Sequence, residues 1–207
     1  HEVGVELLTS DYALTAYLDE FAVFGDPDYR VDFAHERIEH WNNLHEEISQ
    51  CMYNVGSWTL EKGALVGHGA QLAEIFTGST RWQNVHVKTA LQPVTGKGHN
   101  LEFRVQGAMR CYAVGLAADN KLVLYKKNGQ YEKLAETDLG WKNGCEYTLE
   151  ATAVGNAITV SIDGEIAFRY VDEDEPYLYG SVGLSSFGPA SCQWRFIEVT
   201  PVEKEEK

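Results

Sequence analysis

The fold is decided by three runs of sequence: Tyr147-Thr148-Leu149-Glu150-Ala151-Thr152-Ala153, Ile158-Thr159-Val160-Ser161-Ile162 and Ile166-Ala167-Phe168-Arg169-Tyr170-Val171. The alternation of apolar and polar residues is typical of β-strands that bury one face. Gly155-Asn156 lies between the first two runs and Asp163-Gly164 between the last two. Because these dipeptides favour tight hairpin turns, the three runs predict an antiparallel meander.

The same signals continue outward from this meander. Trp58 to Leu60, a turn at Glu61-Lys62-Gly63 and the run from Ala64 to Gly67 predict a first hairpin. Further strands are expected at residues 85–91, which Pro93 should terminate, and at residues 101–106, 110–116, 122–126, 131–134, 180–185 and 193–199. Ten or more short strands at regular spacing predict an all-β fold, an antiparallel two-sheet jelly-roll sandwich at residues 57–201. Residues 202–207 are expected to be a disordered tail.

A similar two-strand pattern stands at both ends of the chain. Val3-Gly4-Val5 and the run from Tyr17 to Val23 resemble Val182-Gly183-Leu184 and the run from Trp194 to Val199. The later copy closes the sandwich. The earlier copy predicts that residues 1–26 are the tail of a preceding β-domain.

Residues 27–56 are expected to connect that tail to the sandwich. Ile38, Trp41, Leu44 and Ile48 recur at helical spacing, which allows a short helix. An irregular crossing segment is the alternative.

Composition restricts the classes of partner. The chain has 207 residues, 44% hydrophobic and 12% aromatic content, and a formal net charge of −14. This charge argues against nucleic acid and anionic membranes, whose phosphates would be repelled. The four cysteines show no CxxC pair or metal-finger spacing, which favours a reducing cytoplasm.

The most informative hairpin for function is the pair of runs on either side of Gly107-Ala108-Met109. A three-residue loop pairs Gln106 with Arg110 and Arg104 with Tyr112. One face is then apolar, and the other carries Arg104, Gln106, Arg110 and Tyr112. Guanidinium forks and a stacking phenol can hold sugar hydroxyls, carboxylates or phosphates. Arg–Tyr pairing on a solvated face is the alternative.

Trp82 is the best candidate for an exposed stacking residue, since it follows the loop at residues 77–81. Aromatic residues of a β-sandwich more often belong to the core. Trp82 is nevertheless included with Arg104, Gln106, Arg110 and Tyr112 in the predicted ligand-binding set.

The acidic residues predict no cofactor or catalytic centre. The run Asp172-Glu173-Asp174-Glu175 could bind calcium, although a solvated turn is the favoured interpretation. A glycosidase needs two carboxylates facing each other across a cleft. Glu102, Glu150 and Asp163 lie in or beside expected strands, but no acidic motif links them.

Two stretches resemble the concanavalin A-like (laminin-G-like) β-sandwiches. Residues 56–65, Gly-Ser-Trp-Thr-Leu-Glu-Lys-Gly-Ala-Leu, resemble their opening hairpin. Residues 158–164 followed by residues 180–184 resemble their closing signature. This resemblance implies the fold and does not fix a function.

A narrower resemblance covers roughly residues 33–201. Residues 45–50, 57–60 and 100–107 look like the accessory region C-terminal to the catalytic domain in bacterial ADP-ribosylglycohydrolase-family proteins. That catalytic domain is helical and binds magnesium through acidic clusters, and nothing in this chain matches it. The resemblance implies a non-catalytic part of a larger hydrolase, whose catalytic domain would be a partner.

These observations lead to three hypotheses. The first is a non-catalytic accessory module that binds carbohydrate or a sugar-containing small molecule. The second is a structural or assembly module without a small ligand. The third is a glycoside hydrolase acting through carboxylates of the sandwich.

Overall fold

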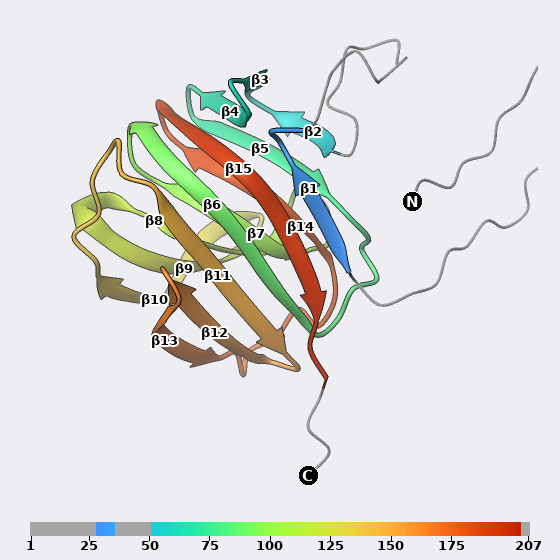
Figure 1. Ribbon diagram of the computed structural model, residues 1–207. Helices are drawn as coiled ribbons and strands as arrows, with labels where there is room; N and C mark the ends of the chain where they lie inside the picture. The colour runs from blue at the N-terminus through green and yellow to red at the C-terminus, as the bar shows by residue number, and fades with distance from the viewer. Residues whose placement is uncertain (1–27, 36–50, 204–207) are drawn as a thin grey trace, which may run out of the picture.

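The computed structural model describes residues 28–35 and 51–203, which form a sandwich of two antiparallel sheets (Figure 1). The sheets confirm the all-β, two-sheet architecture. The eight-stranded sheet has the order β13-β12-β11-β6-β15-β4-β3, with β1 pairing on β15, and the seven-stranded sheet has the order β10-β9-β8-β7-β14-β5-β2.

The strands of the eight-stranded sheet are β1 (Tyr29–Asp32), β3 (Ser57–Glu61), β4 (Ala64–Gly69), β6 (Val85–Thr95), β11 (Tyr147–Val154), β12 (Ala157–Ile162), β13 (Glu165–Val171) and β15 (Ala190–Pro201). Those of the seven-stranded sheet are β2 (Cys51–Val55), β5 (Leu72–Thr77), β7 (His99–Val105), β8 (Arg110–Leu116), β9 (Lys121–Asn128), β10 (Gln130–Asp138) and β14 (Ser181–Phe187). A 3-10 turn, Ala118–Asn120, precedes β9.

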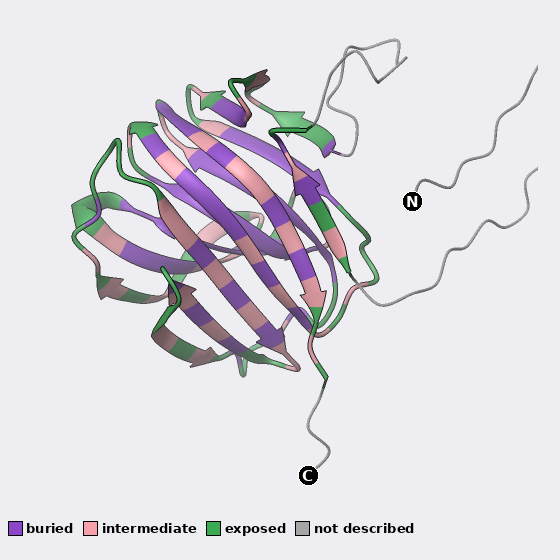
Figure 2. Ribbon diagram, viewed as in Figure 1, coloured by how far each residue is buried: buried purple, intermediate pink, exposed green. Residues whose placement is uncertain are grey.

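The core lies between the two sheets (Figure 2). Alternate residues of each strand enter it, such as Leu149, Ala151 and Ala153 of β11, which are 0% exposed. Trp194 of β15 and Phe103 of β7 are among its largest fully buried side chains. This alternation confirms the strand pattern inferred for the meander at residues 147–171.

One expected strand end was wrong, and one strand was missed. Pro93 does not terminate β6, which continues to Thr95. Pro93 pairs with Cys192 on one side, while β11 on the other side pairs with β6 only from Val85 to Leu91. A proline is tolerated where its missing N–H has no strand to serve. The strand β5 was not expected, because Glu74 interrupts its apolar residues.

The segment at residues 27–56 is more than a connection. Strand β1 pairs with β15, and β2 forms one edge of the seven-stranded sheet, so the sandwich begins before residue 57. The expected tail at residues 1–26 and the possible helix at residues 38–48 lie outside the described residues.

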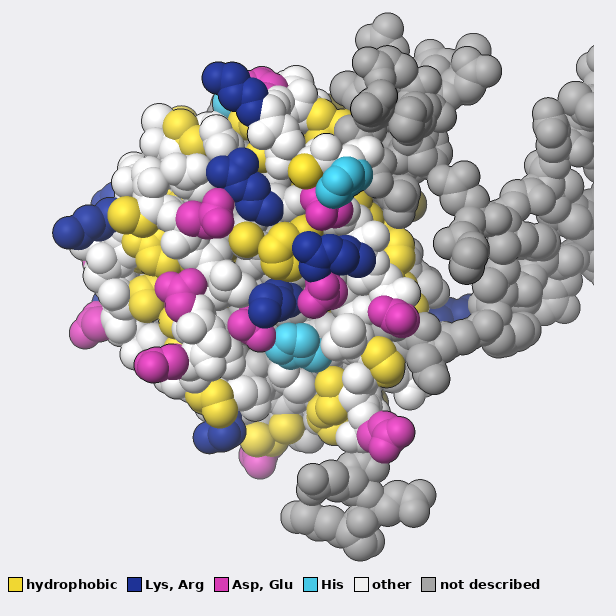
Figure 3. Space-filling model, viewed as in Figure 1, with side chains coloured by type: hydrophobic (Ala, Val, Ile, Leu, Met, Phe, Trp, Pro, Cys, Tyr) yellow, Lys and Arg dark blue, Asp and Glu magenta, His cyan; other side chains and the backbone are white. Residues whose placement is uncertain are grey.

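The outer face of the eight-stranded sheet is half exposed. His86, Lys88 and Glu150 lie there between the buried positions of β6 and β11. Figure 3 looks onto this face and shows basic, acidic and histidine side chains interspersed across it. Such mixed charge is that of an ordinary solvated surface.

The outer face of the seven-stranded sheet is concave. The ammonium of Lys127 on β9 lies 2.5 Å from Glu74 Oε1 on β5. Four strand intervals separate β9 from β5, which is about 19 Å along a flat sheet at about 4.8 Å per interval. Two side chains cannot span that distance, so the sheet must curl until its two flanks meet across this face.

Candidate functional site

Arg104 is a buried residue at the end of β7, only 1% exposed. Its guanidinium donates to the carbonyl oxygens of Gly155 and Tyr177, each at 2.5 Å, and of Gln83 at 3.2 Å. These acceptors belong to three separate loops. Arg104 therefore ties the loops at one end of the sandwich together.

The expected pairing of Arg104 with Tyr112 was wrong. Tyr112 pairs with Phe103, and the neighbouring strand β14 pairs with Phe103 and Val105 while skipping Arg104. Arg104 is thus the extra residue of a β-bulge, with a left-handed φ of 51°. The bulge reverses the faces on either side of it, so Tyr112 points into the core and Cys111 to the concave face.

Close packing against this bulge requires Gly180. Its φ is 152°, and a Cβ at this position would lie 2.2 Å from the carbonyl carbon of Arg104. Only glycine allows the backbone of residues 172–180 to approach β7 so closely.

Tyr112 holds the same loop from inside the core. It is 1% exposed, its hydroxyl donates to Asp172, and it accepts from the Tyr177 N–H at 3.0 Å. Burial, followed by the hydrogen bond to Asp172, raises the pKa of Tyr112 above its ordinary range. The phenol therefore remains a neutral donor at physiological pH.

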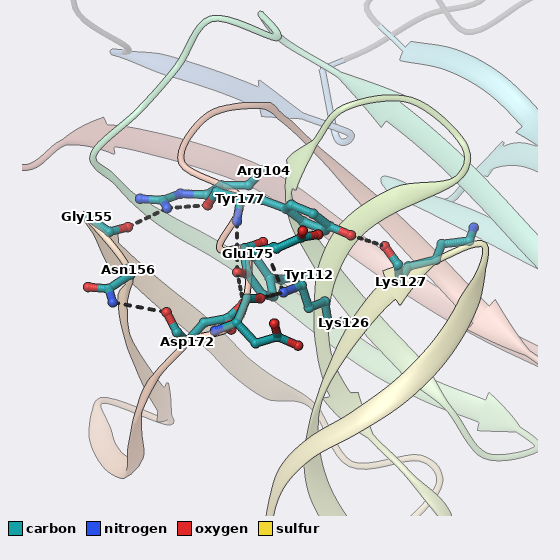
Figure 4. Close-up of polar contacts among 10 residues, drawn as sticks. Arg104, Tyr112, Lys126, Lys127, Gly155, Asn156, Asp172, Glu175 and Tyr177 are labelled. Atoms are coloured by element: carbon teal, nitrogen blue, oxygen red, sulfur yellow. Dashed lines mark hydrogen bonds and ion pairs between the residues drawn. The ribbon is translucent and has the colours of Figure 1, made fainter.

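Asp172 is an anchor, whereas the sequence favoured a solvated turn. It is 2% exposed and forms an ion pair with Lys126 at 2.8 Å. Burial opposes its ionisation, but hydrogen bonds from Lys126 and Tyr112 hold the pKa of Asp172 below its ordinary value. Lys126 also donates to the carbonyl oxygens of Asp174 and Glu175, so the loop is fixed over the end of β9 (Figure 4).

An open hollow of about 220 Å³ lies outside this anchored loop. Tyr177 forms part of its wall, and the guanidinium of Arg110 lies 4.6 Å from the centre of that ring. The polar side chains that line the hollow come from β9, β10 and the loop: Lys126, Asn128, Gln130, Glu132, Asp174 and Glu175. They offer amide donors and acceptors, carboxylate acceptors and one ammonium in a small space.

The five predicted ligand-binding residues are divided by the structure. Arg104 and Tyr112 lie beneath the loop, while Arg110 is exposed beside Tyr177. Gln106 is half-buried and donates to the carbonyl oxygen of Tyr179 at 3.0 Å. Trp82 is half-buried, packs against Tyr29 at a ring distance of 5.3 Å, and does not line the hollow.

The residues around the hollow were missed by the sequence reasoning. Asn128 and Gln130 lie between the strands expected at residues 122–126 and 131–134 and were not considered as binding residues, although amides on both sides of Gly129 are a usable signal for hydrogen bonding. Asp174 and Glu175 were noted only as acidic loop residues. Their proximity to the β9–β10 turn depends on folding and could not be inferred from spacing.

The described ranges contain no group of three or more His, Cys, Asp or Glu side chains placed to hold a metal ion. Over the same residues, no helix has both the length and the apolar character needed to cross a membrane. Cys145 is an exposed free thiol, whereas Cys111 and Cys192 are buried free thiols.

No family model and no curated protein matches this chain. Solved structures with the same fold include the carbohydrate binding module CBM66 from Bacillus subtilis, with a TM-score of 0.67, 17% identity, and coverage of 73% of this chain and 96% of that one. The β-glucanase of Bacillus licheniformis has a TM-score of 0.62, 12% identity and coverage of 85% and 99%. The lumenal domain of VIP36 has a TM-score of 0.61, 11% identity and coverage of 79% and 88%. At these identities the similarity establishes a concanavalin A-like or galectin-like sandwich.

Proposed function

We propose that this chain is a non-catalytic module that binds carbohydrate, or a small molecule containing a sugar, at the hollow beside Tyr177. The observation that carries this proposal is an open, polar-lined hollow whose base is held by buried hydrogen bonds of Arg104 and Tyr112. Preorganised side chains lose little entropy when a ligand binds. The fold is shared with a module named for carbohydrate binding and with a VIP36 domain crystallised with Man3GlcNAc, which supports the same class of ligand.

Recognition would rest on hydrogen bonds to sugar hydroxyls. Asn128 and Gln130 can both donate and accept, and the carboxylates of Glu132 and Asp174 accept. Arg110 extends this set at the rim with a planar donor fork. Each hydrogen bond would contribute about 1 kcal/mol net, so we expect modest affinity from the isolated module.

We also propose that this chain is part of a larger hydrolase. The resemblance of residues 33–201 to the accessory region of bacterial ADP-ribosylglycohydrolase-family proteins supports a role beside the catalytic domain of a cytoplasmic hydrolase. ADP-ribose, which contains two riboses, is then a candidate ligand alongside oligosaccharides.

The proposal is tested by thermal-shift titration with a panel of oligosaccharides and ADP-ribose. A ligand that binds only the folded state raises the melting temperature by mass action. We expect a shift that Gln130→Ala weakens and that Asn143→Ala preserves, because Asn143 is an exposed amide that does not line the hollow. An equal loss in both variants, or no shift in a protein that melts cooperatively, would overturn the proposal.

A second candidate is an assembly module, favoured by exposed apolar side chains near the hollow. Met109, Leu178 and Tyr179 are 59%, 47% and 52% exposed. A change in elution volume on Leu178→Ser, without any ligand-induced shift in the native protein, would support assembly over sugar binding.

Glycoside hydrolysis is the third candidate. Glu74 and Glu102 approach the same phenol oxygen, that of Tyr131, but both carboxylates are 0% exposed. A hydrolase needs its carboxylate pair open to substrate, so this geometry favours binding at the hollow over catalysis on the sheet.

A further inference from the structure

Four ionisable side chains meet on the concave face, and none of them is among the residues that line the hollow. The Tyr131 hydroxyl on β10 lies 2.8 Å from Glu74 Oε1 and 2.7 Å from Glu102 Oε1. Lys127 on β9 lies 2.5 Å from the same Glu74 oxygen. Both carboxylates are 0% exposed and Lys127 is 5% exposed.

These contacts join the two flanks of the curved sheet. Tyr131 and Lys127 come from the β9–β10 flank, whereas Glu74 comes from β5 on the other side of β14. Phe187 of β14 also contacts the β9–β10 flank, since its ring centre lies 4.4 Å from that of Tyr131. We call Glu74, Glu102, Lys127 and Tyr131 the concave-face latch.

The geometry of the latch requires an additional proton. A phenol has one hydrogen, so it can donate to only one of the two carboxylate oxygens that lie within hydrogen-bond distance. The second short contact is a hydrogen bond only if that carboxyl is protonated and donates to Tyr131. Charge leads to the same conclusion, because two ionised carboxylates beside one ammonium would bury a net negative charge.

The surrounding groups indicate which carboxyl holds the proton. Glu74 is surrounded by donors, since Lys127 and Tyr131 reach Oε1 and Asn54 of β2 reaches Oε2 at 2.6 Å. Glu102 Oε2 makes no hydrogen bond to any described residue. Glu74 is therefore the ionised partner of Lys127, and Glu102 is the protonated one.

The remaining groups around Glu102 do not supply a cation to it. The neutral hydroxyl of Ser185 on β14 lowers the pKa of Glu102, but by less than burial and Glu74 raise it, and Cys111 on β8 presents a thiol whose pKa burial raises well above its ordinary value. Burial, followed by the charge of Glu74, raises the pKa of Glu102 from 4.5 to about 8. This direction agrees with the proton count from the geometry.

We propose that Glu102 retains a proton at neutral pH and that this proton closes the latch between the two flanks of the seven-stranded sheet. When the proton is lost, the carboxylates of Glu74 and Glu102 repel each other across Tyr131. The flanks then separate, and the concave face becomes accessible to solvent. The latch is thus a pH-sensitive closure of a face distinct from the proposed ligand hollow.

The sign of the pH dependence follows from linkage. Between about pH 4.5 and about 8 the folded state holds a proton on Glu102 that the unfolded state has released. The stability contributed by this proton is fully present below pH 4.5 and falls as the pH rises through that window. Above about pH 8 this contribution has been lost and does not change further, because both the folded and the unfolded state have released the proton.

The first test compares urea unfolding of the native chain with Glu102→Gln from pH 5 to pH 9. The amide imitates the protonated carboxyl at every pH. The free energy of unfolding of the variant should therefore increase relative to that of the native chain as the pH rises. One proton of difference gives about a tenfold relative change in the folding equilibrium constant per pH unit. Glu165→Gln, at an exposed position of β13 on the other sheet, is the matched control and should keep the native pH dependence. Parallel curves for the native chain and Glu102→Gln would overturn the proposal.

The second test measures opening directly through Cys111. This thiol lies on the concave face opposite Lys127 in the strand pairing and is 1% exposed. We expect its alkylation rate, relative to that of exposed Cys145, to rise between pH 7 and pH 9 in the native chain and to rise less in Glu102→Gln. The charge of Glu102 also raises the pKa of Cys111, so its loss in Glu102→Gln should favour the reactive thiolate, and a smaller rise in the variant therefore reports closure of the face.

Tyr131→Phe provides a check that does not depend on Glu102→Gln folding well. Removal of the bridging hydroxyl should make Cys111 reactive already at neutral pH. Protection of Cys111 in Tyr131→Phe equal to that in the native chain would show that the latch does not close this face.

Discussion

The outer faces of the two sheets are built from the same alternating pattern and have opposite environments. On the eight-stranded sheet, Glu150 lies 3.1 Å from His86 and 3.7 Å from Lys88, and all three side chains retain contact with solvent. On the seven-stranded sheet, Glu74 and Lys127 form an ion pair with side-chain exposures of 0% and 7%. The difference comes from curvature, since only the concave face brings its own flanks together.

This comparison teaches that a charged residue on the outer face of a strand is not necessarily solvated. The energetic consequences differ sharply between the two faces. An exposed ion pair is screened by water and contributes little. A buried pair contributes little net stability when intact, but losing one partner leaves an unpaired buried charge.

The largest expected effect is therefore that of Lys127→Met. This change leaves Glu74 ionised and buried beside Glu102, and we expect a loss of about 3–5 kcal/mol in the free energy of unfolding at neutral pH. Urea denaturation measures it. In the double variant with Glu74→Gln much of the loss should be recovered, because the unpaired charge is gone. A loss of less than about 1 kcal/mol from Lys127→Met would mean that water reaches the latch and that the two faces are alike.

Local patterns predicted the meander, and curvature explains most of what they missed. The turns at Gly155-Asn156 and Asp163-Gly164 connect β11, β12 and β13 as expected, because hairpin chemistry is local. Glu74 interrupts the apolar residues of β5, and Glu102 stands between Leu101 and Phe103. A lone carboxylate in an apolar strand was the available signal for the latch, but its partners come from strands far along the chain.

The candidate site was predicted less well for a different physical reason. The alternation in residues 101–113 assumes regular strands, and a left-handed φ at Arg104 cannot be inferred from that alternation. One bulged residue moved Tyr112 to the core and placed Arg104 under the loop. Arg110 and Gln106 retained positions near the hollow because they lie beyond the bulge, next to the turn.

Tyr112→Phe should have an intermediate effect and extends the comparison to the buried polar base of the hollow. It removes a hydroxyl that donates to Asp172 and accepts from the Tyr177 N–H. Leaving these buried groups without their partner should cost about 1–3 kcal/mol, measured by urea denaturation. Tyr179→Phe is the control in the same loop. Because Tyr179 is 52% exposed, this change should leave the free energy of unfolding almost unchanged. Equal effects of the two changes would contradict a buried hydrogen-bonded base.

Lys88→Met on the eight-stranded sheet should have the smallest effect and sets the lower end of the comparison. Lys88 is 35% exposed at its side chain, and Glu150 keeps His86 as a second neighbour when Lys88 is lost. Methionine retains most of the apolar stem, so only a screened ion pair disappears, and we expect a change below about 1 kcal/mol. Added salt should reduce even this difference, whereas the Lys127→Met loss should persist because buried charges are screened much less. If salt changed both losses equally, curvature would not separate the two faces, and the concave face would have to be treated as an open, hydrated surface.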